Sequence, residues 1–151
     1  MDAERLFSLG NLAVLPGWLV LVFLPRWKWG AAFLVGGLIP LLLGTCYVFL
    51  FFPNFGSADG GFGSIDEVRE LFANDAILTA GWLHYLAFDL FIGAWIVRDA
   101  RPRGIPHLAV VPCLPLTFMF GPTGLVAYLV LRWGWKRDLL LGTEPNLAAS
   151  A

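Results

Sequence analysis

Charged residues are scarce in this chain. Of its 151 residues, 14% are charged and 58% are apolar, whereas soluble domains carry about 25% charged residues. The mean hydropathy is +0.74, and the seven tryptophans and thirteen phenylalanines exceed what a small soluble core requires. The composition therefore excludes an ordinary soluble protein and predicts one integral membrane domain over residues 1–151.

Motifs for several common chemistries are also missing. The net charge is -1 and no basic stripe is present, which argues against nucleic acid as a partner. Cys46 and Cys113 lie in apolar runs without a CxxC spacing, so both are interpreted as small buried hydrophobic residues. The chain has no Gly-x-Ser-x-Gly, phosphate loop or dinucleotide fingerprint. It also has no H-x-x-x-H or E-x-x-H spacing, so no cofactor or metal is predicted unless separate helices assemble the ligands.

A removable targeting segment is not evident at the start of the chain. Residues 1–5 are acidic in character, and no small-residue cleavage site follows them. We therefore expect the first apolar run to be a permanent helix. This favours a bacterial inner membrane, or a plastid envelope if the protein comes from a plant.

Long apolar runs are abundant, and four of them have the length of a membrane span, about 20 residues for a hydrocarbon core of about 30 Å. The predicted spans are residues 6–24, 31–52, 75–97 and 106–131. The fourth begins at Pro106 and has three further prolines inside it, Pro112, Pro115 and Pro122, so we expect it to pack inside the bundle with a break near residues 120–124. The predicted fold is thus an all-α integral membrane bundle of four transmembrane helices.

The segments outside the spans are short. Ser64 and Glu67 fit a capping box, which predicts a short amphipathic surface helix near residues 64–73. Residues 132–151 are expected to form a tail. With four spans, five of the ten basic residues fall on each side of the membrane, so the positive-inside rule does not select an orientation.

The third predicted span carries an ionisable residue at its centre, Asp89. A carboxylate at mid-bilayer costs about 2.5–3.5 kcal/mol on insertion scales, so it usually has a partner or a use. A purely structural Asp89 would be bonded to Asn11, Thr45, Tyr128 or a kinked backbone. Otherwise Asp89 acts directly on a ligand or a proton.

Two neighbours on the same helix can assist Asp89. Tyr85 precedes it by four residues, which makes a hydrogen bond between phenol and carboxylate feasible. His84 precedes it by five residues, about 140° around a helix, so a direct His84–Asp89 pair is not expected. Asn74 and Asp75 are interpreted as caps of this helix. A charged group at its far end is interpreted as a lipid head-group anchor; it comprises Arg98, Asp99, Arg101 and Arg103.

Two segments resemble a known family. Residues 81–93, GWLHYLAFDLFIG, resemble the third-helix signature of the neoxanthin-synthase-like family of the abscisic-acid-deficient type, and residues 121–128, GPTGLVAY, resemble its fourth-helix signature. The resemblance covers about residues 5–133. It implies a small membrane protein that handles a carotenoid or related isoprenoid. Plant members are needed for neoxanthin formation from violaxanthin, in which a 5,6-epoxide opens and an allene forms without net redox change.

The resemblance also implies a candidate site. Its matched positions are His84, Tyr85, Asp89, Gly121, Pro122 and Tyr128. In the leading hypothesis, an epoxycarotenoid isomerase, Asp89 transfers the proton, His84 assists and Tyr85 orients the carboxylate. The expected substrate contacts are Trp82, Phe88, Gly121, Pro122 and Tyr128. Two alternatives stay open: a non-catalytic pigment- or lipid-binding subunit, and a small proton-linked transporter component. Membrane lipid is an expected partner, and a homo-oligomer or a membrane enzyme as partner also stays open.

Overall fold

The structure is a computed structural model that describes residues 2–27 and 29–137, and within these ranges it is all-α, as predicted. The elements, in chain order, are α1 (Ala3–Phe23), the π-helix η1 (Trp29–Leu38), α2 (Ile39–Phe55), α3 (Ile65–Leu71), α4 (Asp75–Ala100), α5 (His107–Val110), α6 (Cys113–Phe120) and α7 (Pro122–Lys136). The predicted tail is helical up to Lys136, and its residues 138–151 lie outside the described ranges.

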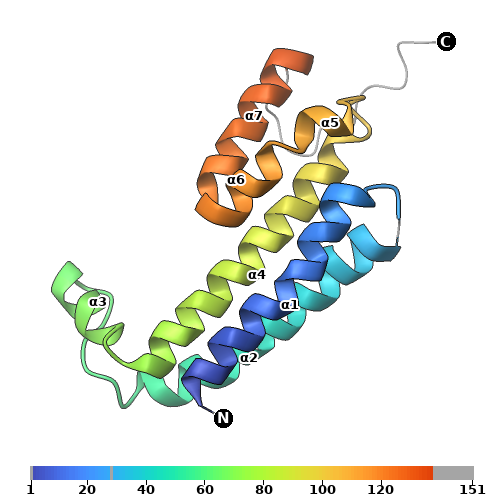
Figure 1. Cartoon of the computed structure of the whole chain (residues 1–151). Helices are drawn as coiled ribbons and strands as arrows, with labels where there is room; N and C mark the ends of the chain where they lie inside the picture. The colour runs from blue at the N-terminus through green and yellow to red at the C-terminus, as the bar shows by residue number, and fades with distance from the viewer. Residues whose placement is uncertain (1, 28, 138–151) are drawn as a thin grey trace.

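Three helical stretches in the described part of the chain are long and apolar enough to cross a membrane: Ala3–Phe23, Phe33–Phe55 and Asp75–Ala100. They correspond to the first three predicted spans. α1, α2 and α4 lie side by side as the long part of the molecule (Figure 1). α1 continues as one helix through Pro16.

The fourth predicted span is not one continuous helix in this structure. The segment forms α5, α6 and α7, and α7 returns beside α6 instead of continuing onward (Figure 1). The reversal occurs at Gly121, whose φ of 46° and ψ of -101° are accessible to glycine at little steric cost. Pro122 follows; it has no N–H for α6 and disfavours helical geometry in the residue before it. The break is therefore where the sequence predicts it, but the result is a hairpin of two short helices.

α6 and α7 pack closely because the second helix presents a glycine to the first. A Cβ atom placed on Gly124 would lie 2.1 Å from Oγ1 of Thr117 and 2.6 Å from the carbonyl oxygen of Cys113. Only a residue without a side chain fits there. Cys113 is buried, as predicted, whereas Cys46 is exposed on α2, so its interpretation as a buried residue is wrong.

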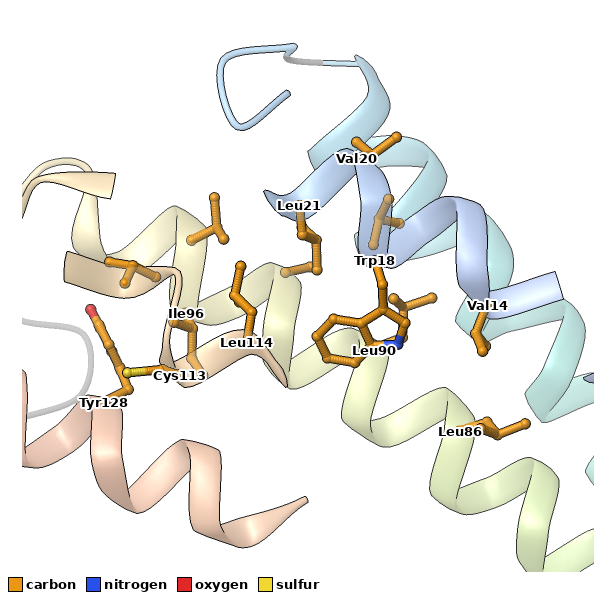
Figure 2. Packing of buried hydrophobic residues seen from close by; sticks show 14 of the residues in the cluster. Val14, Trp18, Val20, Leu21, Leu86, Leu90, Ile96, Cys113, Leu114 and Tyr128 are labelled. Carbon is orange, nitrogen blue, oxygen red and sulfur yellow. The ribbon is translucent and has the colours of Figure 1, made fainter. Parts of the chain in front are cut away.

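The core lies where α1 and α4 meet and continues under the hairpin (Figure 2). Leu21, Leu90 and Leu114 are fully buried in it. Gly93 allows the close approach of α1, because an added Cβ would lie 2.8 Å from the Trp18 ring. Gly44 on α2, by contrast, makes no such close contact, because an added Cβ would have no described atom within 4 Å.

Side-chain caps fix the starts of the two helices that follow α2, namely α3 and α4. The Ser64 hydroxyl accepts a hydrogen bond from the Glu67 N–H at 3.2 Å, and the Glu67 carboxylate accepts one from the Gly63 N–H at 2.9 Å. These contacts confirm the cap of the predicted surface helix, which ends at Leu71. The Asn74 side chain accepts hydrogen bonds from two N–H groups at the start of α4, which confirms its capping role.

Candidate functional site

The carboxylate of Asp89 faces the turn between α6 and α7. A Cβ atom placed on Gly121 would lie 3.0 Å from Oδ1 of Asp89 and 3.3 Å from its Oδ2. Asp89 is only 9% exposed. Gly121 is the N-cap of α7, and helix N-termini attract negative charge. The two signature segments of the sequence, residues 81–93 and 121–128, therefore meet at this point.

The hydrogen bonding of this carboxylate is incomplete. Among the described residues, Oδ2 of Asp89 is buried and has no hydrogen-bond partner, which is uncommon for a buried polar atom. The Tyr85 phenol lies close enough to interact with the carboxylate, as the four-residue spacing predicts. Its own hydrogen bond goes to the carbonyl of Phe118 at 3.4 Å. Tyr85 thus connects α4 to the end of α6 beside Asp89.

The side chains that could have made Asp89 purely structural are engaged elsewhere. Asn11 accepts a hydrogen bond from the Trp82 indole at 2.9 Å. Thr45 donates to the carbonyl of Leu41 at 2.7 Å. Tyr128 donates to Asp99 at 2.5 Å. Of the four structural partners that the sequence allowed for Asp89, only the kinked backbone, at Gly121, lies next to its carboxylate among the described residues.

His84 has different neighbours. It is exposed on the outer face of α4, where its ring lies 5.7 Å from that of Tyr47 and 4.5 Å from that of Phe88, between centroids. Asp89 faces the hairpin turn. The structure therefore agrees with the predicted separation of the two side chains and does not bring them together.

The five predicted substrate contacts are dispersed. Gly121 lies at the carboxylate, and the next residue, Pro122, is exposed beside it. Trp82 is partly exposed and packs on Phe7. Phe88 is exposed on the other side of α4. It borders a groove of about 250 Å³, lined also by Pro40, Gly44, Ala87 and Phe91. Tyr128 is fully buried and bonded to Asp99, so this structure does not offer it to a ligand.

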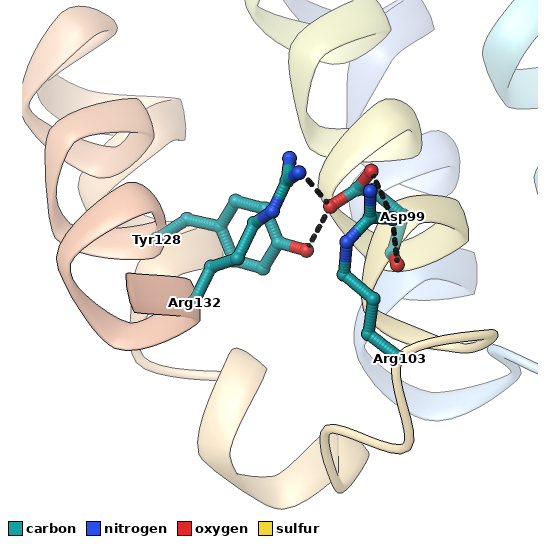
Figure 3. Close-up of polar contacts among 4 residues, drawn as sticks. All are labelled: Asp99, Arg103, Tyr128 and Arg132. Carbon is teal, nitrogen blue, oxygen red and sulfur yellow. Dashed lines mark hydrogen bonds and ion pairs between the residues drawn. The ribbon is translucent and has the colours of Figure 1, made fainter. Parts of the chain in front are cut away.

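Sequence reasoning missed a buried ionic cluster at the far end of α4 (Figure 3). Asp99 Oδ1 lies 2.6 Å from Nη1 of Arg103, and Asp99 Oδ2 lies 3.3 Å from Nη1 of Arg132 and accepts the hydrogen bond from Tyr128. Arg132 is fully buried and Arg103 is nearly so. The head-group interpretation is therefore wrong for Asp99 and Arg103. The available signal was the four-residue spacing of Tyr128 and Arg132, which places both on one helix face.

A metal centre is not found in the part of the chain that the structure describes. Within residues 2–27 and 29–137, no group of three or more histidine, cysteine, aspartate and glutamate side chains could hold a metal ion.

The candidate site lies within the part of the chain that resembles known proteins. The profile of the family described as ABA DEFICIENT 4-like matches residues 5–128. Protein ABA DEFICIENT 4, chloroplastic, of Arabidopsis thaliana is 23% identical over 138 residues, which are 86% of this chain and 61% of that relative. The chain thus spans less than two thirds of the length of this relative. No solved structure matches the chain.

Proposed function

The chain belongs to the ABA DEFICIENT 4-like family, and from this premise we propose that it binds a carotenoid or related isoprenoid in a membrane and isomerises it at Asp89. The observation that carries the proposal is the buried carboxylate oxygen that accepts no hydrogen bond from any described residue and is held against the hairpin turn. The resemblance to neoxanthin-synthase-like proteins supplies the substrate class. An epoxide is the reacting group that this class implies.

A single carboxyl group can perform both proton transfers of such an isomerisation. Protonated Asp89 donates its proton to the epoxide oxygen as the C–O bond opens. The resulting carboxylate then removes a proton from the carbon skeleton, and the allene forms. No electrons are gained or lost overall, and Asp89 ends in its starting state. This scheme replaces the assistance expected from His84, which faces other neighbours.

Tyr85 acts as a positioning residue in this scheme. Its phenol lies beside the carboxylate and its hydrogen bond to Phe118 links the two elements that enclose the site. Tyr85 and Phe118 are half-buried, and Pro122 is exposed. Because Asp89 is only 9% exposed, we propose that the substrate enters between Tyr85 and Pro122 as the hairpin turn shifts away from α4.

A specific feature favours a second candidate function, binding without conversion. Six aromatic rings form a row across α4, α2 and the following loop, with adjacent centroids 4.5–5.7 Å apart. In order, the row comprises Phe88, His84, Tyr47, Phe51, Phe55 and Phe62. Phe88 also borders the apolar groove on this face. A long conjugated ligand could lie along these rings without reaching Asp89, as a pigment-binding subunit would require.

The location follows the same reasoning. The name of the Arabidopsis relative describes that protein as chloroplastic. It gives no support to a bacterial inner membrane, the location that the start of the sequence favoured. We propose a plastid membrane, in agreement with the alternative drawn from the sequence.

Expression in a host that makes epoxycarotenoids tests the proposed function. The pigments of the cells and those that co-purify with the protein in detergent are separated and identified. A new isomer of the supplied epoxide supports the enzyme. Bound but unchanged pigment supports the pigment-binding subunit. If the pigment is neither converted nor bound, both candidate functions are contradicted.

A further inference from the structure

A cavity of about 300 Å³ lies between the end of α1 and the end of α4, away from Asp89. Its polar wall includes Arg26, Arg101 and His107, and its apolar wall includes Val97 and Val110. We propose that this cavity binds the phosphate of an anionic phospholipid head group. The inference concerns a site that the proposed isomerase does not use.

The hairpin changes the charge balance between the two ends of the bundle. Because α7 runs from the level of Asp89 back to the level of Asp99, the end of α7 lies on the same side as the loops at residues 24–27 and 101–106 (Figure 1). Of the nine basic residues in the described part of the chain, that side carries seven, namely Arg26, Arg98, Arg101, Arg103, Arg132, Lys136 and Arg137. The other side carries Arg5 and Arg69.

This unequal distribution of basic residues selects a membrane orientation, which the equal count for four spans did not. Basic residues gather on the side that is not translocated, so the end with the cavity faces the cytosol or stroma. Anionic lipids attract such basic segments at the surface of that leaflet. The cavity therefore opens where phospholipid head groups lie.

The lining suits a phosphate. Two guanidinium groups can form charge-assisted hydrogen bonds with phosphate oxygens, and none of the described residues that line the cavity is acidic. Asp99, an acid near this end of α4, is paired with Arg103 and Arg132. The volume is at the small end for ligand sites, which suits a head group with its acyl chains outside.

His107 fixes one wall of the cavity. Its Nε2 lies 2.9 Å from the carbonyl oxygen of Val22. A carbonyl can only accept, so Nε2 carries the hydrogen, and Nδ1 is the remaining polar atom of the ring. The bond ties α5 to the last turn of α1 and holds the cavity open between them.

The opposite end of the bundle offers an internal comparison. A cavity of about 440 Å³ there is lined by Asp2, Glu4 and Asp75. An anionic head group is repelled by such a lining. The two cavities therefore predict selective binding at one end only.

Lipid retention by the purified full-length chain tests the proposal. The protein is exchanged into detergent with phosphatidylglycerol or phosphatidylcholine, and bound lipids are counted by native mass spectrometry. Wild type should retain phosphatidylglycerol in preference to phosphatidylcholine. The double variant R26Q/R101Q should weaken phosphatidylglycerol binding by roughly tenfold or more, since each guanidinium contributes charged hydrogen bonds.

The matched control is R98Q/K136Q, which removes two exposed basic residues from the same end outside the cavity. It should bind phosphatidylglycerol like wild type. Equal loss in the two double variants, or equal retention of the two lipids by wild type, would overturn the proposal. If millimolar inorganic phosphate displaces the lipid from the wild-type protein, the ligand of the cavity is free phosphate and not a phospholipid. That titration needs no variant, so a folding failure does not obscure it.

Discussion

Two aspartates on α4, ten residues and roughly 15 Å apart along the helix axis, both face the α6–α7 hairpin but differ in their surroundings. Asp99 lies at the base of the hairpin and is bonded to Arg103, Arg132 and Tyr128 (Figure 3). Asp89 lies at its turn, and its Oδ2 has no hydrogen bond among the described residues. The difference separates a carboxylate that holds the structure together from one that is available for chemistry.

The largest effect on stability is expected from Asp99→Asn. The variant removes the carboxylate that two buried guanidinium groups contact, and breaking a buried ion pair in this way costs about 3–5 kcal/mol. Thermal unfolding in detergent measures the loss. Asp89→Asn is the matched control, because it makes the same substitution on the same helix at a side chain that no ion pair holds, and it should change the unfolding free energy by less than about 1 kcal/mol. Equal destabilisation by the two variants would show that Asp89 is as important for stability as Asp99, which contradicts the account.

Tyr128→Phe should have the next largest effect. It removes a phenol that donates a 2.5 Å hydrogen bond to Asp99, and hydrogen bonds to charged groups contribute about 1.5–3 kcal/mol. Unfolding by denaturant in detergent measures the change. Tyr47→Phe is the control, because the ring of Tyr47 stacks on Phe51 and packs at a tilt against His84, and the variant keeps this ring. A Tyr128→Phe variant as stable as wild type would show that the cluster does not anchor the hairpin.

Gly121→Ala tests the turn that faces Asp89. The positive φ costs an alanine about 1–2 kcal/mol, and the new methyl group would lie 3.0 Å from the Asp89 carboxylate. We expect a modest loss of stability and a severe loss of conversion. Gly134→Ala, where an added Cβ meets nothing within 4 Å, should keep both. Normal conversion by Gly121→Ala would place the reaction away from the turn.

Much of the fold could be predicted from the sequence. Long apolar runs located the three spans, and side-chain caps at Ser64 and Asn74 located two helix starts. Proline and glycine located the break near residue 121. The reversal of direction could not be predicted, because hydropathy measures the length of an apolar run and not the path of its backbone. The positive φ of Gly121 decides that path.

The same limit explains the outcome at the site. Helix periodicity correctly separated His84 from Asp89, since both lie on one helix. The pairing of Asp99 with Arg132 depends on α7 folding back. Because the sequence alone does not show this reversal, it favours a lipid head-group role for Asp99. The contact between Asp89 and Gly121 depends on it as well.

The most direct test of the account is pigment conversion by Asp89→Asn in a host that makes epoxycarotenoids. The substitution is nearly isosteric and keeps hydrogen-bonding capacity, but it removes the transferable proton. The account predicts a folded protein that still retains pigment and forms no isomerised product, while Asp75→Asn at the start of α4 converts normally. Wild-type conversion by Asp89→Asn would contradict the central claim.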